Sequence, residues 1–145
     1  MNKQILPFLL LTIIISGCVG APDQNVIPNT VDKFYSQIKA KNFEGTLELF
    51  SDEFYKYLSR NDTVKFLELI NEKLGNLENY TIISWNVKTF TTTAGNSQTF
   101  TLVYNVTYSK HIAVETLILT QRNSKEFKID RYSVNSRGLL EILEE

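Results

Sequence analysis

Apolar and polar side chains alternate through residues 99–109 of this sequence. Successive side chains of a strand point to opposite faces, so this alternation predicts a strand with one apolar and one polar face. The apolar face carries Phe100, Leu102, Tyr104, Val106 and Tyr108. The other face carries Thr99, Thr101, Val103, Asn105, Thr107 and Ser109. A single strand cannot bury such a face, so we expect the rest of the chain to cover it.

Two weaker strands follow this one. In 114–121 the alternation is weaker, with Val114, Thr116, Ile118 and Thr120 opposite Glu115, Leu117 and Leu119. A turn through Asn123, a residue type that tolerates positive φ, leads to the stretch 127–134. There Phe127 and Ile129 share one parity while Tyr132 and Val134 share the other. That slip predicts a β-bulge near Asp130 and Arg131, which would bend the sheet.

Helical patterns come before the strands. The first is expected from Asn29 or Thr30 to between Ala40 and Asn42, with Val31, Phe34, Tyr35 and Ile38 on one stripe. A short apolar stripe at Phe43, Leu47 and Phe50 follows, and Ser51 marks a break before another short piece at 54–58. A longer helix is expected from a cap at Asn61 or Asp62 to Gly75, burying Val64, Leu67, Ile70, Asn71 and Leu74.

The first long strand is expected from Tyr80, with Ile83, Trp85 and Val87 opposite Ile82, Ser84, Asn86 and Lys88. Residues 91–98, which contain Gly95, read as the turn into the next strand. The tail 139–145 is either a last helical turn or a frayed end.

The N-terminus has the composition of an export signal. Lys3 is followed by a nearly continuous apolar run, 5–15, which is shorter than the roughly 20 residues that span a membrane. The run ends in Ile15-Ser16-Gly17-Cys18, which resembles the lipobox of prokaryotic lipoproteins. That resemblance implies that Cys18 receives a lipid and becomes the first residue of the mature chain. The alternatives are an ordinary secreted protein with an incidental cysteine, or an uncleaved N-terminal anchor.

We therefore expect a signal peptide at 1–17, a lipidated tether at 18–28, a single domain at 29–138 and a tail at 139–145. The protein would be held at the cell membrane by the lipid on Cys18, facing outside the cytoplasm. Cys18 is the only cysteine, so the domain would fold without a disulfide.

Charge and motifs exclude several classes of function. The formal net charge is −1 and the basic residues are interspersed with acidic ones, so no nucleic-acid-binding surface is predicted. The sequence has no glycine-rich phosphate loop, no metal-spaced Cys or His cluster and no Gly-x-Ser-x-Gly motif. We accordingly predict no cofactor and no metal.

Helices followed by long antiparallel strands predict an α+β domain, with N-terminal helices packed on a bent antiparallel four-stranded sheet. In this order the chain resembles the nuclear-transport-factor-2-like (cystatin-like) cone fold, and is similar to its uncharacterised exported subfamily. The resemblance covers roughly residues 30–135. It is carried by 31–40, by Asn42 to Ser51, by Leu74-Gly75, by Tyr104 to Tyr108, by Glu115 to Leu117 and by Phe127 to Asp130.

The resemblance implies a pocket between the sheet and a long helix. Trp85, Tyr104 and Tyr108 are candidates for its walls, and Glu115, Asp130 and Arg131 for polar groups at its mouth. The competing interpretation is that the aromatic residues form core and the charged residues a solvated sheet face. His111, the only histidine, is expected in a solvated turn.

The sequence names no reaction. We expect a non-enzymatic binding or accessory domain, with a small apolar ligand or a protein as its partner. The alternative is a small isomerase- or dehydratase-like enzyme with an acid or base and a Tyr donor inside the cone. A third hypothesis is pairing through the sheet face around Val103, as a weak homodimer.

Overall fold

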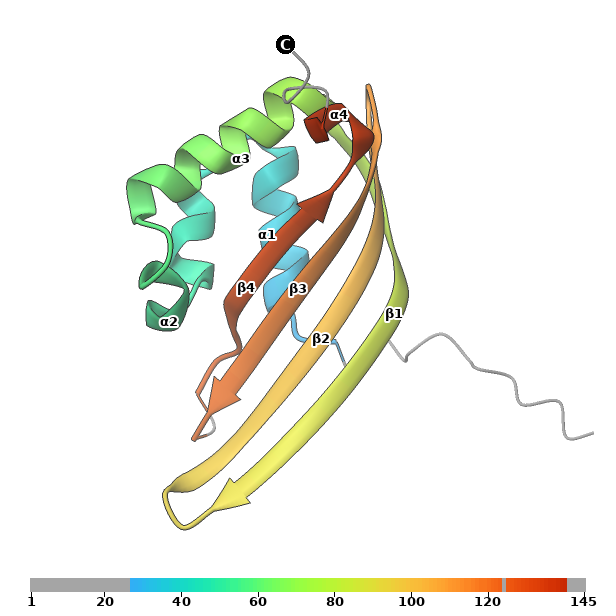
Figure 1. Cartoon of the computed structure of the whole chain (residues 1–145). Coiled ribbons are helices and arrows are strands. Elements are labelled where there is room, and N and C mark those ends of the chain that lie inside the picture. Colours follow the sequence, from blue (N-terminus) through green and yellow to red (C-terminus); the bar gives the residue numbers. More distant parts are fainter. Residues whose placement is uncertain (1–26, 124, 141–145) are drawn as a thin grey trace, which may run out of the picture.

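The computed structural model describes residues 27–123 and 125–140, and its elements follow the expected order (Figure 1). The leader 1–17, Cys18, most of the tether and the end of the tail lie outside the described residues. The helical elements are α1 (Thr30–Lys39), the 3-10 helix η2 (Glu44–Leu49), α2 (Asp52–Tyr55), α3 (Arg60–Leu74) and α4 (Arg137–Leu140). The strands are β1 (Leu77–Thr92), β2 (Gly95–Tyr108), β3 (Ile112–Arg122) and β4 (Lys128–Asn135).

The strands form one antiparallel sheet in the order β1-β2-β3-β4. Figure 1 shows the sheet curving along its length, with the helices gathered on one side of it. The predicted α+β fold, helices packed on a bent four-stranded antiparallel sheet, is therefore confirmed. The alternation that predicted it is also confirmed, because the apolar parity of β2 is buried. Its buried members are Phe100, Leu102, Tyr104, Val106 and Tyr108.

Helix α1 buries the predicted stripe against this face: Val31, Phe34, Tyr35 and Ile38. Helix α3 buries Leu67, Ile70 and Leu74, together with Thr63. Its N-cap is Ser59 and not Asn61 or Asp62, because the Ser59 hydroxyl accepts the Asp62 N–H at 3.1 Å. No helix among the described residues is long and apolar enough to cross a membrane.

The predicted bulge in β4 is confirmed. Ile118 pairs with Arg131 while the next residue, Leu119, pairs with Ile129, so Asp130 has no opposite partner. A second irregularity, between Ile82 and Ser84 in β1, was not expected. It places Ile82 on the same face as Trp85, so the predicted grouping of Ile83 with Trp85 and Val87 is wrong.

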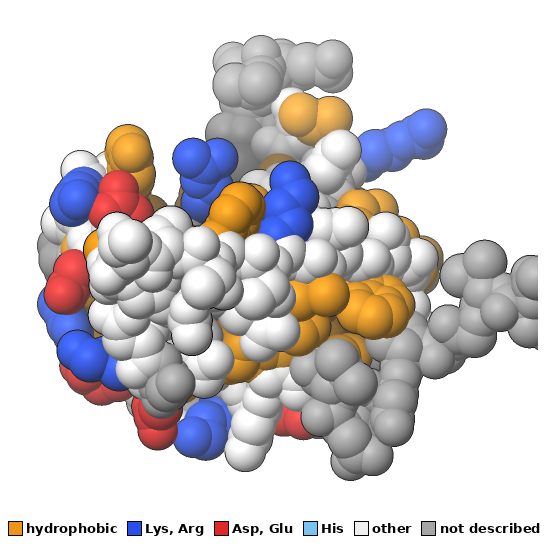
Figure 2. All heavy atoms as spheres, turned by 90° about the horizontal axis from the view of Figure 1, so that it is seen from below, with side chains coloured by type: hydrophobic (Ala, Val, Ile, Leu, Met, Phe, Trp, Pro, Cys, Tyr) orange, Lys and Arg blue, Asp and Glu red, His pale blue; other side chains and the backbone are white. Residues whose placement is uncertain are grey.

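The expected turn over 91–98 is also wrong. Thr92 pairs with Gly95, so only Thr93 and Ala94 join β1 to β2, and Gly95 takes a φ of 131° that favours glycine. Both strands thus extend well past the helices, as Figure 1 shows. We call residues 83–99 the hairpin arm. From below, hydrophobic side chains lie open among uncharged polar ones (Figure 2).

The contact between helix and sheet predicts a stability difference. Leu67 of α3 and Val106 of β2 are almost completely buried. Truncation of a packed core side chain leaves a cavity, so Leu67→Ala should lower the free energy of unfolding by about 2–5 kcal/mol and Val106→Ala by about 1–3 kcal/mol. Urea melts measure both values.

The matched control is Leu69→Ala, since Leu69 lies on the same helix but is 38% exposed. It should change the free energy by no more than about 0.5 kcal/mol. If Leu67→Ala and Leu69→Ala cost the same, α3 does not pack through the face described.

Candidate functional site

Glu115 lies at the centre of the helix–sheet interface. It has the same parity in β3 as Leu117 and Leu119, which places it on the helix side of the sheet, and its exposed fraction is 0%. The expectation that Glu115 stands at the mouth of a pocket is therefore wrong. The apolar parity of the strand decided its position, and its charge did not.

Three tyrosine hydroxyls donate hydrogen bonds to this carboxyl group. Tyr108 donates to Oε1 at 2.6 Å. Tyr35 and Tyr132 both donate to Oε2, at 3.1 Å and 2.9 Å. Each carboxyl oxygen thus has at least one donor, which is what a buried carboxyl group requires. We call these four residues the Glu115 cluster.

Each member of the Glu115 cluster comes from a different element. Tyr35 lies on the buried stripe of α1, Tyr108 closes β2, Glu115 lies in β3 and Tyr132 in β4. The bulge at Asp130 restores Tyr132 to the helix side, because it pairs with Leu117. The cluster therefore ties the first helix to three neighbouring strands.

Burial controls the protonation of these groups. It raises the pKa of Glu115, because a charge is costly away from water, although the three tyrosine hydrogen bonds work in the opposite direction. Burial, and then the neighbouring Glu115, also raise the pKa of Tyr35 and of Tyr108 above the ordinary value. The same causes raise the pKa of Tyr132. The tyrosines thus stay protonated at neutral pH and remain donors.

The Glu115 cluster contains a carboxyl group and hydroxyl groups, which can transfer protons in enzymes. Here these groups form hydrogen bonds with one another. A general acid or base must come within hydrogen-bond reach of a substrate proton, about 2.6–3.2 Å. Glu115 has no exposed surface, Tyr35 is 1% exposed and Tyr108 is 3% exposed. Tyr132 is only partly buried, so the cluster reaches the surface through that side chain, while the Glu115 carboxyl group itself is closed to a substrate.

The other sequence-predicted site residues do not join this cluster. Tyr104 is buried beside Tyr35, with ring centroids 5.4 Å apart, so it is core as the competing interpretation held. Trp85 lies on the hairpin arm and is 37% exposed. Asp130 pairs with Arg122 at 2.9 Å.

Arg131, beside Asp130, is exposed and pairs with Ile118 on the face away from the helices. Asp130, in β4, is therefore separated by β3 from Tyr104 in β2 and from Trp85 in β1. The expected pocket with Glu115, Asp130 and Arg131 at its mouth does not form.

Sequence reasoning missed Tyr35 and Tyr132 as partners of Glu115. A signal was present: a carboxylate on the apolar parity of a strand needs donors from the layer that covers it. Tyr35 was already on the buried stripe of the first helix, and the parity slip at Asp130 turned Tyr132 inward. The sequence pattern did not show which residues of the helix and of the neighbouring strands contact Glu115.

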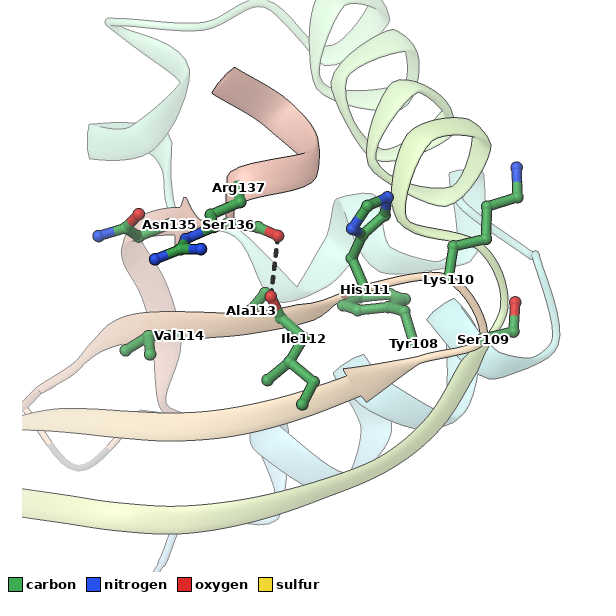
Figure 3. A pocket seen from close by; sticks show the side chains of 10 residues that line it. All are labelled: Tyr108, Ser109, Lys110, His111, Ile112, Ala113, Val114, Asn135, Ser136 and Arg137. Carbon is green, nitrogen blue, oxygen red and sulfur yellow. Dashed lines mark hydrogen bonds between the residues drawn. The ribbon is translucent and has the colours of Figure 1, made fainter. Parts of the chain in front are cut away.

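An open hollow of about 570 Å³ lies at the end of the sheet, around the β2–β3 turn (Figure 3). Its lining comes from residues 108–114 and 135–137 and includes Lys110, His111 and Arg137 but no acidic side chain. Ser136 donates to the Ile112 carbonyl at 2.8 Å and joins the two segments. The three basic side chains point in different directions in Figure 3. His111 lies between β2 and β3 and is partly exposed, as expected.

Metal ligands do not gather in the described part of the chain. Within 27–123 and 125–140, no three His, Cys, Asp or Glu side chains are close enough together to hold a metal ion.

The comparison with solved structures finds likeness of low sequence similarity. No protein-family model matches this chain, and no curated protein does. Among solved structures, the chain is similar to a "putative dehydratase from the NTF2-like family" of Streptomyces avermitilis. The sequences are 12% identical, the match covers 74% of this chain and 90% of that chain, and the TM-score is 0.42.

The raised pKa of Glu115 predicts a pH dependence of stability. The folded state holds the Glu115 proton more tightly than the unfolded state, whose glutamate has a pKa of about 4.3. The bound proton therefore adds to the free energy of unfolding, and this stabilisation is complete below about pH 4. It is lost as the pH rises through the folded pKa, and the total loss is about 1.4 kcal/mol for each unit by which the folded pKa exceeds the unfolded one. Glu115→Gln cannot ionise and should lack that loss.

Urea melts of the protein and of Glu115→Gln from pH 4 to pH 8 measure the difference. The free energy of unfolding of Glu115→Gln should rise relative to that of the unchanged protein as the pH increases. Parallel curves for the two proteins would contradict the raised pKa. Glu78→Gln, a change at an exposed glutamate in β1, is the control and should run parallel to the unchanged protein.

Proposed function

We propose that this protein is a membrane-anchored lipoprotein whose small domain binds a ligand or partner and performs no catalysis. The observation that carries the non-catalytic part is the enclosure of Glu115. Its carboxyl group has no exposed surface, and three tyrosine hydroxyls hold it. With the interior filled in this way, the surfaces that remain available to a ligand are on the outside of the domain.

The anchor rests on the sequence Ile15-Ser16-Gly17-Cys18 after an apolar run. Two acyl chains on one residue suffice for stable attachment, since each buried methylene contributes about 0.8 kcal/mol. The first helix of the domain, α1, begins at Thr30, twelve positions after Cys18. It would therefore work close to the surface to which it is attached.

The hollow around the β2–β3 turn is the binding surface that we favour. Its volume of about 570 Å³ falls in the range of small-molecule sites, about 300–1,000 Å³. His111 stands between Arg137 and Lys110 (Figure 3); the Lys110 ammonium group donates to the Glu72 carbonyl at 2.9 Å and would have to leave it to contact a ligand. Basic groups without an acidic neighbour favour a ligand with a carboxylate or phosphate group.

The alternative function is a small isomerase- or dehydratase-like enzyme. The observation in its favour is that an acid and several hydroxyl donors lie within one cluster. Substrate access would require the Tyr35 hydroxyl, and with it part of α1, to leave Glu115. The enclosure of the cluster therefore makes the binding function the better supported one.

Lipidation is tested by metabolic labelling with a radioactive fatty acid. The unchanged protein should take up label and Cys18→Ser should take up none, because Cys18 supplies the only thiol. Ala21→Ser places the same new side chain three positions later and should stay labelled. Label on Cys18→Ser would contradict the anchor.

Ligand binding is tested by native mass spectrometry of the protein released from detergent micelles. A retained anionic small molecule is expected on the unchanged protein and should be lost from Arg137→Glu. Arg131→Glu, at an exposed arginine on the outer face of β4, is the control and should keep the ligand. A ligand that survives Arg137→Glu but is lost from Glu115→Gln would favour the enzyme.

A further inference from the structure

The hairpin arm leaves large apolar side chains uncovered. Ile83 is 57% exposed, Phe90 54%, and Trp85 and Val87 37% each. Every residue from Ile83 to Ala94 is exposed. An edge strand with open backbone groups and open apolar side chains is a liability in water, which proteins usually cover or protect with charge.

The uncovered side chains lie on both faces of the arm. Val87 pairs with Phe100, on the helix side of the sheet, whereas Phe90 pairs with Ser97, on the opposite side. Trp85, paired with Leu102, is on the helix side with Val87. A protein docked on one face of the arm would leave the apolar side chains of the other face exposed to water. A medium that surrounds the arm can take up both faces.

The charge of this region suits a lipid interface. No aspartate or glutamate occurs between residues 79 and 114, a stretch that includes the whole arm. Lys88 is the only charged side chain of the arm. The other polar side chains of the arm carry hydroxyl or amide groups. Tryptophan, with an apolar ring and one N–H donor, is enriched where hydrocarbon meets headgroups, and cationic side chains are drawn to anionic lipids.

The attachment point brings the arm to the membrane. The Thr30 hydroxyl at the start of α1 donates to the Phe127 carbonyl at 2.8 Å. The ring of Phe127 packs against the ring of Phe100, with the two centroids 5.4 Å apart. Phe100 in turn pairs with Val87, so the domain begins at the level of the arm. Figure 1 shows that the start of α1 is the end of this helix nearer to the β1–β2 turn.

The chain between the lipid and the domain is short. Ten positions separate Cys18 from Pro28, which allows a reach of at most roughly 36 Å. The 16 residues of β1 span roughly 53 Å, so the far end of the sheet cannot approach the membrane as readily as the arm.

We propose that the hairpin arm inserts its apolar side chains into the interface of the lipid bilayer to which the protein is anchored. This inference rests on the proposed lipid anchor at Cys18. The arm would act as a second contact, which holds the domain in one orientation and turns the hollow around the β2–β3 turn away from the lipid.

The single tryptophan of the chain, Trp85, reports on the arm directly. The lipidated protein is reconstituted in vesicles of phosphatidylcholine and phosphatidylglycerol with bromine on the acyl chains. Trp85 emission should shift to shorter wavelength, lose most of its intensity to the bromine and become shielded from acrylamide in the water.

Two variants sharpen this measurement. Val87→Glu with Phe90→Glu puts charges on both faces of the arm and should restore acrylamide quenching while the protein remains attached. Leu69→Glu puts a charge at a leucine of α3 that is 38% exposed and lies outside the arm, and should leave Trp85 quenched by bromine. Should the double variant fail to fold, the quenching of the unchanged protein still decides.

Vesicle flotation separates the two proposals. A protein that floats with the vesicles but whose Trp85 is open to acrylamide and insensitive to bromine overturns the arm contact alone. A protein that does not float overturns the anchor and the arm contact together. Shielding of Trp85 from acrylamide without quenching by bromine would mean that a second copy covers the arm, which also overturns the proposal.

Discussion

The hydrogen bonds to Glu115 hold the two layers of this protein together. A carboxyl group in an apolar interface is costly unless its oxygens have donors, and here the donors come from one helix and two strands. Loss of the helix layer would remove the Tyr35 donor and open the carboxyl group to water, whereas Tyr108 and Tyr132 belong to the same sheet as Glu115. The polar groups of the interior therefore stabilise the fold, and the candidate binding sites lie on the surface.

The β4 bulge is the structural condition for this arrangement. Ile129 and Tyr132 are three positions apart, so in a regular strand they would point to opposite faces. The extra residue, Asp130, puts both on the helix side, where Ile129 is core and Tyr132 reaches Glu115. Asp130, predicted as a site residue, thus acts through the geometry of the strand.

The sheet divides the molecule into two unequal ends. Where helices cover the sheet, aromatic rings fill the interface. The rings of Tyr35 and Tyr80 are stacked there, with their centroids 4.1 Å apart. Toward the β1–β2 turn the strands run past the helices of the described residues (Figure 1), and the hairpin arm exposes side chains on both faces. The arm and the basic hollow around His111 lie near opposite ends of β2, so anchoring and ligand binding would not compete for the same surface.

The sequence by itself determined the order of elements, the buried stripe of α1, the inner face of β2 and the bulge at Asp130, because local periodicity encodes each of them. It put Glu115 on the same strand parity as Leu117 and Leu119, but did not show that this parity is the buried one. Only the tertiary structure decided that Tyr35, Tyr108 and Tyr132 meet there, since their separations along the chain reach 80 residues. The length of the hairpin arm was likewise decided by pairing across strands, which joined Thr92 to Gly95 where composition alone indicated a longer turn. Side-chain patterns report the face on which a residue lies, whereas contacts between elements depend on how those faces are packed.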